Sequence, residues 1–163
     1  MPLLKFVVTN KKMKKVIFYI CAFILLSGCA QQYLNTHLPI VKMPTKAFQV
    51  NNLTKKQQSL LMIQFQPNHW RFIQTNALGA PIARMVLTNK GWRNDGFIMP
   101  NSQSKLLFTA LINDLYPQEN FFNIQQKNGV FYWGKTHWQV QHNKNIEINF
   151  TNMQYQLTTM EFK

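Results

Sequence analysis

From Ser59 onward, short apolar runs alternate with polar and turn residues along the chain. Runs of about four to eight residues bounded by Pro, Asn or Gly are typical of β-strands joined by tight turns. A first block of predicted strands spans 60–65, 70–75 and 82–88, with a further hairpin through Trp92. A second block spans 130–133, 138–140, 146–150 and 155–157.

The segment between the two blocks has helical spacing instead. Its apolar residues lie on one side of a helix, at positions 107, 108, 111, 112 and 115. Ser102 or Ser104 is a suitable N-terminal cap, and Pro117 is a suitable stop. The spacing predicts an amphipathic helix of about three turns over 104–115.

Alternation within the strands indicates that one face of the sheet is apolar. Ile146, Ile148 and Phe150 fall on one side of their strand, and Glu147 and Asn149 on the other. Because a half-apolar sheet must be covered, and the chain offers one obvious helix, we predict a mainly β (α+β) fold. Its form would be an incomplete antiparallel barrel, or strongly curved sheet, with a helical lid. Whether side chains fill the concave side or leave a cavity stays open.

A different pattern occupies the N-terminus. The apolar run 16–26 has eleven residues, whereas a membrane-spanning helix needs roughly 20. With lysines before it and Ser27-Gly28 after it, the run is typical of a secretory signal, which we place at 1–28. Met13 also fits an ordinary signal start, so 1–12 is either an upstream extension or a wrongly assigned start.

The chain has two cysteines, and Cys21 lies inside the predicted signal. Leu26-Ser27-Gly28-Cys29 resembles the bacterial lipobox, whose cysteine is acylated and becomes the N-terminus after cleavage. We therefore predict a lipid anchor at Cys29. Several acyl chains on one residue would hold the protein stably, because each buried methylene adds about 0.8 kcal/mol to membrane binding. The alternative is a soluble secreted protein with a stray cysteine. Ala30-Gln31, without aspartate, resembles the sorting signal of Gram-negative lipoproteins destined for the outer membrane.

The predicted mature chain divides into a tether at 29–57 and one domain at 58–163. The tether contains Pro39 and Pro44 and shows no sustained period. The whole chain carries a net charge of +13, and the mature part stays basic after five lysines leave with the signal. An exported protein does not meet the chromosome, so we expect no nucleic-acid partner. The remaining readings are a solvated basic surface and a mild attraction to anionic lipid headgroups.

Residues that could carry catalysis are sparse. The five acidic residues show no spacing suited to paired acid–base work. His137 and His142 flank a predicted strand and would point to opposite faces, which is poor geometry for a shared metal. We therefore expect no enzyme activity, no cofactor and no metal site.

Several stretches together resemble a family of bacterial lipoproteins of uncharacterised function that is itself similar to LolB, the outer-membrane lipoprotein receptor. They are the lipobox, LGAPIAR at 78–84, LINDLYP at 111–117 and the late strands, and the resemblance covers 58–163. It implies a LolA/LolB-like half-barrel that binds acyl chains in its concave face. It also implies delivery of lipid or acylated cargo by a periplasmic LolA-like carrier. The family is associated with aryl-polyene-like lipid synthesis, so the cargo need not be a lipoprotein.

The apolar residues that would line such a site are those of the predicted concave face. Large aromatic side chains also dominate ordinary protein cores, so core and cargo site stay open as alternatives. The candidates are Trp70, Phe72, Met85, Trp92, Phe108, Leu111, Trp133 and Trp138. LolB uses an exposed apolar loop, for which 96–100 is the candidate here, with Phe97 and Ile98 as membrane or partner contacts. The alternative function is an interaction or assembly module of a membrane complex without a ligand cavity.

Overall fold

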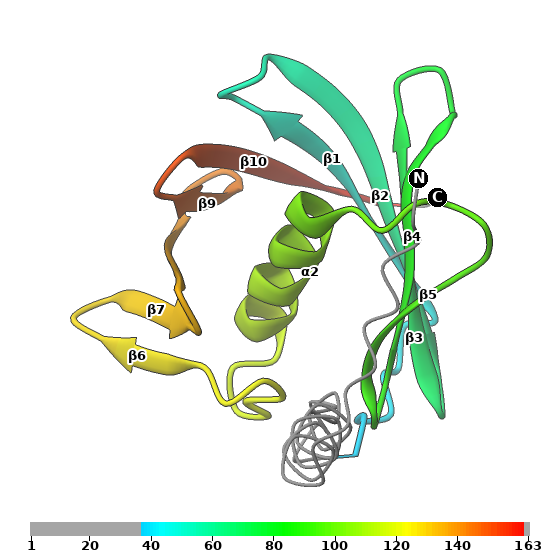
Figure 1. The fold of residues 1–163 in the computed structure, drawn as a ribbon, viewed down its shortest axis with the longest axis horizontal. Helices are drawn as coiled ribbons and strands as arrows, with labels where there is room; N and C mark the ends of the chain where they lie inside the picture. Colours follow the sequence, from blue (N-terminus) through cyan, green and yellow to red (C-terminus); the bar gives the residue numbers. More distant parts are fainter. Residues whose placement is uncertain (1–36, 162–163) are drawn as a thin grey trace, which may run out of the picture. The chain divides into compact units, whose positions relative to one another are not determined.

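The computed structural model describes residues 37–161, so the predicted signal and Cys29 lie outside the described residues. The described part contains ten strands and one helix in the predicted order of strands, helix, strands (Figure 1). The first block is β1 (Thr45–Asn52), β2 (Gln57–Gln66), β3 (His69–Asn76), β4 (Pro81–Thr88) and β5 (Gly91–Asn94). After α2 (Ser102–Leu115) come β6 (Gln125–Lys127), β7 (Val130–Trp133), β8 (Thr136–His142), β9 (Ile146–Phe150) and β10 (Met153–Met160).

All ten strands form one antiparallel sheet in the order β5-β4-β3-β2-β1-β10-β9-β8-β7-β6. The two blocks are joined where β1 pairs with β10, from Ala47–Met160 to Asn52–Tyr155. β5 and β6 are the two ends of this order, so the sheet is not closed. It curves around α2, which lies on its concave side (Figure 1). The predicted mainly β fold with one helix against a curved sheet is confirmed at this level.

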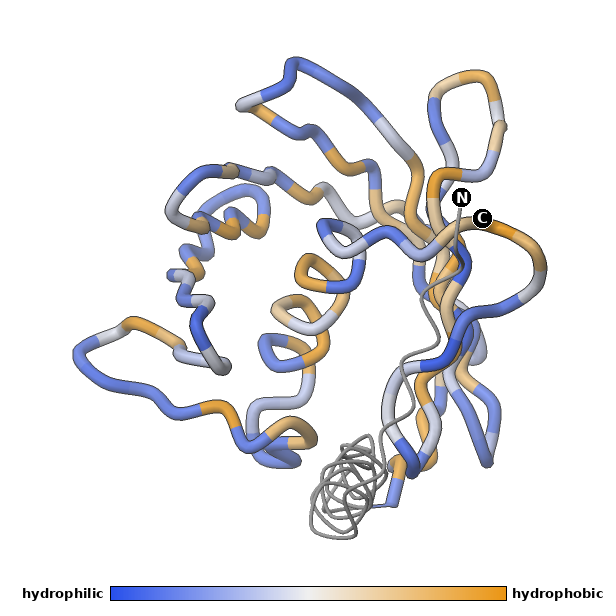
Figure 2. The backbone as a smooth tube through the Cα atoms, in the orientation of Figure 1, coloured by the Kyte–Doolittle hydropathy of each residue, from blue (hydrophilic) through white to orange (hydrophobic). Residues whose placement is uncertain are grey.

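Period-2 alternation explains why this sheet has a buried concave face. Along β2 and β4 every second residue is buried, as at Leu61 and Ile63 in β2 and Met85 and Leu87 in β4. Figure 2 shows hydrophobic and hydrophilic positions interspersed along the strands and along α2. Packing against α2 removes the inner side chains of the first block from water.

The helix begins at Ser102, and its cap lies one residue before Ser102 and three residues before Ser104, the two predicted caps. Asn101 is the N-cap, and its side-chain oxygen accepts a hydrogen bond from Ser104 N at 3.0 Å. Ser104 is instead buried against the sheet. The predicted stop is confirmed, since the helix ends at Leu115 with Tyr116 as C-cap, just before Pro117. Among residues 37–161, no helix is both long enough and apolar enough to cross a membrane.

The predicted tether over 29–57 is wrong from Thr45 onward. Thr45–Asn52 is β1, a central strand that pairs with β2 on one edge and β10 on the other. Only a few apolar side chains mark it, but Ala47, Phe48 and Val50 are almost completely buried, and Phe48 and Val50 belong to the hydrophobic core. The domain boundary predicted at residue 58 therefore lies too late in the chain.

Candidate functional site

The predicted cargo residues fall into two groups by burial. Trp70 is completely buried and contacts Phe65, Tyr116 and Phe121, with ring centroids 5.0, 4.9 and 5.6 Å away. Phe72 stacks on Phe108 of α2 at 5.2 Å. The buried group packs in the core between sheet and helix and consists of Trp70, Phe72, Met85, Phe108, Leu111 and Trp138. Trp92 and Trp133 form the second group, which is only partly buried.

These two tryptophans belong to an aromatic bridge that we define as Trp92, Phe122 and Trp133. Trp92, on β5, stacks on Phe122 at 6.0 Å with nearly parallel rings, and Phe122 lies 5.7 Å from Trp133 on β7. Trp92 Nε1 also donates to Thr109 Oγ1 of α2 at 3.1 Å. The bridge therefore connects β5, at one end of the open sheet, with β7, the strand next to the other end.

The second block carries an apolar strip on its concave face that α2 covers incompletely. Phe131 lies directly opposite the buried Trp138, and Val140 is two residues beyond Trp138, so both share its face. Ile146 stands in the same relation to the buried Ile148. We define Phe131, Trp133, Val140 and Ile146 as the inner strip; all four remain partly exposed.

One polar contact ties the helix to this half of the sheet. His142 Nε2 lies 2.8 Å from Asp114 Oδ1 near the end of α2. His137, also on β8, is bonded instead to Thr151 Oγ1 at 3.1 Å. The two histidines, five residues apart on one strand, point to opposite faces. Within the described residues, no three His, Cys, Asp or Glu side chains are grouped closely enough to hold a metal ion.

The start of α2 is held by a second polar network. Ser104 Oγ donates to Gln74 Oε1 at 2.7 Å, and Gln74 Nε2 donates to Ser59 Oγ at 2.9 Å. Lys55 Nζ donates to Gln103 Oε1 at 2.8 Å. A cavity of about 430 Å³ lies over this network, and none of the predicted cargo residues lines it.

Replacing Ser104 with alanine should destabilise the domain by about 1–3 kcal/mol, because the buried Gln74 carbonyl would lose its donor. Adding Gln74→Leu should recover much of that loss, since both partners are then apolar. Urea unfolding of the single and the double variant measures the free energy of unfolding of each. Ser102→Ala, one exposed position in the same turn, is the matched control and should change little. Equal losses for both serines would contradict a buried network.

Two tyrosines near the ends of the helix are perturbed by burial. Desolvation raises the pKa of Tyr116 and of Tyr155 above the ordinary value of 10.0, because burial disfavours the phenolate. Both therefore remain neutral phenols at neutral pH. Tyr116 packs on Trp70, and Tyr155 lines the cavity.

The apolar loop predicted at 96–100 is partly as expected. Phe97 is fully exposed and Met99 nearly so, whereas Ile98 is partly buried. The prediction missed Leu78, in the β3–β4 turn, which is 93% exposed. An apolar residue within the turn sequence Asn-Ala-Leu-Gly was the signal that could have identified it.

Neither of two sequence comparisons relates the chain to a known protein. No protein-family model matches the chain. No curated protein sequence matches it either. We therefore infer a function from the residues themselves.

Proposed function

We propose that the protein is an outer-membrane lipoprotein of LolA/LolB-like type that binds lipid or acylated cargo on the concave side of its sheet. The observation that carries the proposal is the inner strip. On the concave face of the first block nearly all apolar side chains are buried, Trp92 excepted, whereas Phe131, Trp133, Val140 and Ile146 of the second block keep part of their surface accessible. An acyl chain laid along the strip would remove this apolar surface from water, at roughly 25 cal/mol per Å².

The cargo site we propose therefore differs from the set of residues predicted from the sequence. The buried group, including Trp70 and Phe72, stabilises the wall of the site, and the inner strip with the aromatic bridge supplies the contact surface. Movement of α2 away from β8 would break the His142–Asp114 contact and enlarge that surface. Transfer needs no bond to be made or broken, so no catalytic residue is required.

The first test is the lipid content of the purified protein. The full chain, extracted in a non-ionic detergent and washed, should release a stoichiometric acyl-containing species into organic solvent, identified by mass spectrometry. A fluorescent fatty acid should bind to chain cleared of that species. Chain that carries no lipid and takes up no probe would contradict the proposal.

The location of the site is tested by Val140→Arg. A guanidinium on the inner strip should lower uptake of the fatty-acid probe about tenfold or more, because an acyl chain would have to desolvate the charge. Gln141→Arg is the matched control, since it adds the same charge at the next residue on the opposite, exposed face. Equal uptake by the two variants would place acyl binding elsewhere.

A second candidate function is an interaction module without a ligand. The exposure of Phe97 and Met99 in one loop, and of Leu78 in another, favours it, because burying these large apolar side chains against a protein or membrane would remove them from water. In that case the lipid extract would be empty. A Phe97→Ser, Met99→Ser variant would lose membrane-complex partners in a cross-linking experiment and keep its fold.

A further inference from the structure

The cavity over the start of α2 has a lining that the proposed acyl site does not use. It lies among the β1–β2 turn, the start of β2, the β3–β4 turn and the first turn of α2. One lysine, Lys55, contributes to the wall, and no acidic residue of 37–161 does. The remaining polar lining consists of amides and hydroxyls: Asn52, Gln57, Gln58, Ser59, Gln74, Asn76, Asn101, Gln103, Ser104 and Tyr155.

Hydrogen bonds fix which way three of these amides face. Asn52 Oδ1 accepts from Lys55 N at 2.9 Å, and Asn101 Oδ1 accepts from Ser104 N at 3.0 Å. Asn76 Oδ1 accepts from both Leu78 N and Ala80 N. A backbone N–H can pair only with the amide oxygen, so the orientation of each side chain follows from its partner.

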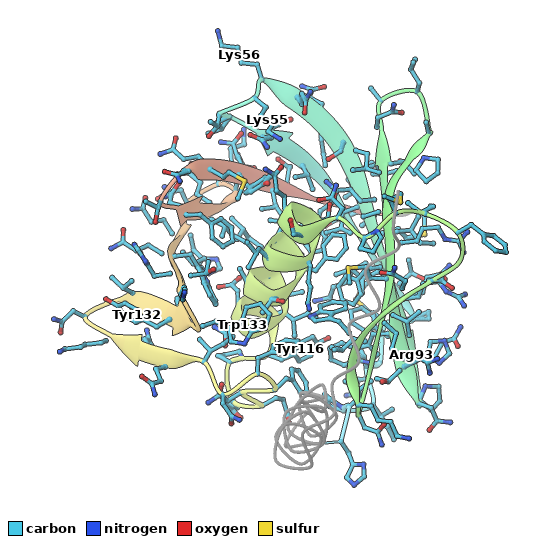
Figure 3. All side chains as sticks on the ribbon, viewed as in Figure 1. Lys55, Lys56, Arg93, Tyr116, Tyr132 and Trp133 are labelled. Carbon is cyan, nitrogen blue, oxygen red and sulfur yellow. The ribbon has the colours of Figure 1, made fainter. Side chains whose placement is uncertain are left out.

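The wall is consequently rich in donors. The acceptor atoms of Asn52, Asn76 and Asn101 are occupied, while their NH₂ groups have no acceptor among the described residues. Lys55 Nζ donates one hydrogen bond to Gln103 Oε1. The other ammonium protons of Lys55 and the NH₂ group of Gln103 remain as donors for a ligand. Lys55 lies at the β1–β2 turn with Lys56 beside it (Figure 3).

This combination selects a class of ligand. A polyol would use both the donors and the acceptors of this lining, but it would gain nothing from the charge of Lys55. A phosphate offers only acceptor oxygens when ionised and carries negative charge, so the amide donors and the lysine match it. Leu78, Ile82 and Leu107 give one side of the cavity an apolar surface against which carbon atoms of an ester can lie.

We propose that this cavity binds the phosphate of a phosphate ester, with Lys55 as the charged contact and the asparagine NH₂ groups as neutral donors. The proposal deepens the proposed function, and rests on it, where the phosphate is the headgroup of the lipid that the protein binds. A free phosphate ester has the same chemistry, and the experiment separates these two sources.

Calorimetric titration of the full chain in non-ionic detergent, at fixed ionic strength, tests the site with glycerol 3-phosphate. Lys55→Gln should weaken binding about tenfold or more, because a charge-assisted hydrogen bond is lost. Lys56→Gln is the matched control, because it removes the same charge at the adjacent residue, which does not line the cavity. It should change the affinity less than about twofold. Gln103→Glu keeps an acceptor for Lys55 but adds a negative charge, and should abolish binding.

A second titration shows whether the phosphate belongs to a lipid headgroup or to a free phosphate ester. If dihexanoyl phosphatidylglycerol binds more tightly than glycerol 3-phosphate, and Lys55→Gln weakens both, the ligand is a lipid headgroup. If the two bind equally, it is a free phosphate ester. The proposal is overturned if glycerol 3-phosphate shows no saturable binding, if glycerol binds as well, or if Lys56→Gln weakens binding as much as Lys55→Gln. Fatty-acid uptake is measured separately, so loss of phosphate binding with retained uptake contradicts only this site.

Discussion

Replacing Trp70 with alanine should lower the free energy of unfolding by about 3–5 kcal/mol, the largest stability loss expected of any single change discussed. The indole is completely buried and sits where β3, the end of α2 and the following segment meet. Its removal leaves a cavity lined by Phe65, Tyr116 and Phe121, whose rings cannot all move to fill it. Because domains are stable by only about 5–15 kcal/mol, much of the chain should be unfolded or insoluble.

Urea unfolding followed by far-UV circular dichroism measures this loss without depending on tryptophan emission. Trp70→Phe should cost clearly less, because the ring packing is largely kept and Nε1 of Trp70 has no hydrogen-bond partner in the described part of the chain to lose. Trp133→Ala is the matched control at a partly exposed site and should also cost less. If Trp70→Ala and Trp133→Ala were equally destabilising, Trp70 would not be a core residue.

Replacing Cys29 with serine should move the protein from the membrane fraction to the soluble fraction of the periplasm. The reason is the proposed anchor: without the sulfur no diacylglyceryl group can be attached, and several acyl chains are what would hold the domain at the membrane. The measurement is incorporation of radiolabelled palmitate together with fractionation of inner and outer membranes. Wild-type chain should be labelled and float with the outer membrane.

Cys21→Ser is the control for this experiment, because it removes the other sulfur from within the predicted signal. It should leave labelling and fractionation unchanged. Labelled Cys29→Ser protein, or wild-type protein that is exported without label, would contradict the lipid anchor. Recovery of labelled wild-type chain with the inner membrane would contradict only the sorting inferred from Ala30 and Gln31.

The fold follows from the sequence wherever side-chain alternation is strong. Strand β9 is an example: Ile148 and Phe150 are buried on the predicted face because a period of two is a direct property of extended backbone. Strand β1 was missed because polar residues outnumber apolar ones in Thr45–Asn52, and its pairing with the distant β10 leaves little trace in local composition. Asn101 was missed as the cap because two serines nearby were equally plausible on sequence alone.

The site was less predictable than the fold. Alternation assigns Trp70, Phe72 and Trp138 to the concave face correctly, but it does not tell which part of that face the single helix covers. That depends on packing, which seals the first block and leaves the inner strip partly accessible. The proposed phosphate site could not have been predicted, because it is assembled from two strand turns and the start of α2, whose proximity exists only in the folded chain.

The pairing of β1 with β10 also sets an order of assembly. The hydrogen bond from Gln154 N to Thr54 Oγ1 spans 100 residues of sequence, and closing so large a loop is a slow, entropically costly step. β2 can pair with β1 early, because the two are neighbours in the chain, but the other edge of β1 stays open until the last strand arrives. An open central edge is a template for aggregation. Pairing with β10, the last of the ten strands, closes that edge and so protects the folded chain from self-association.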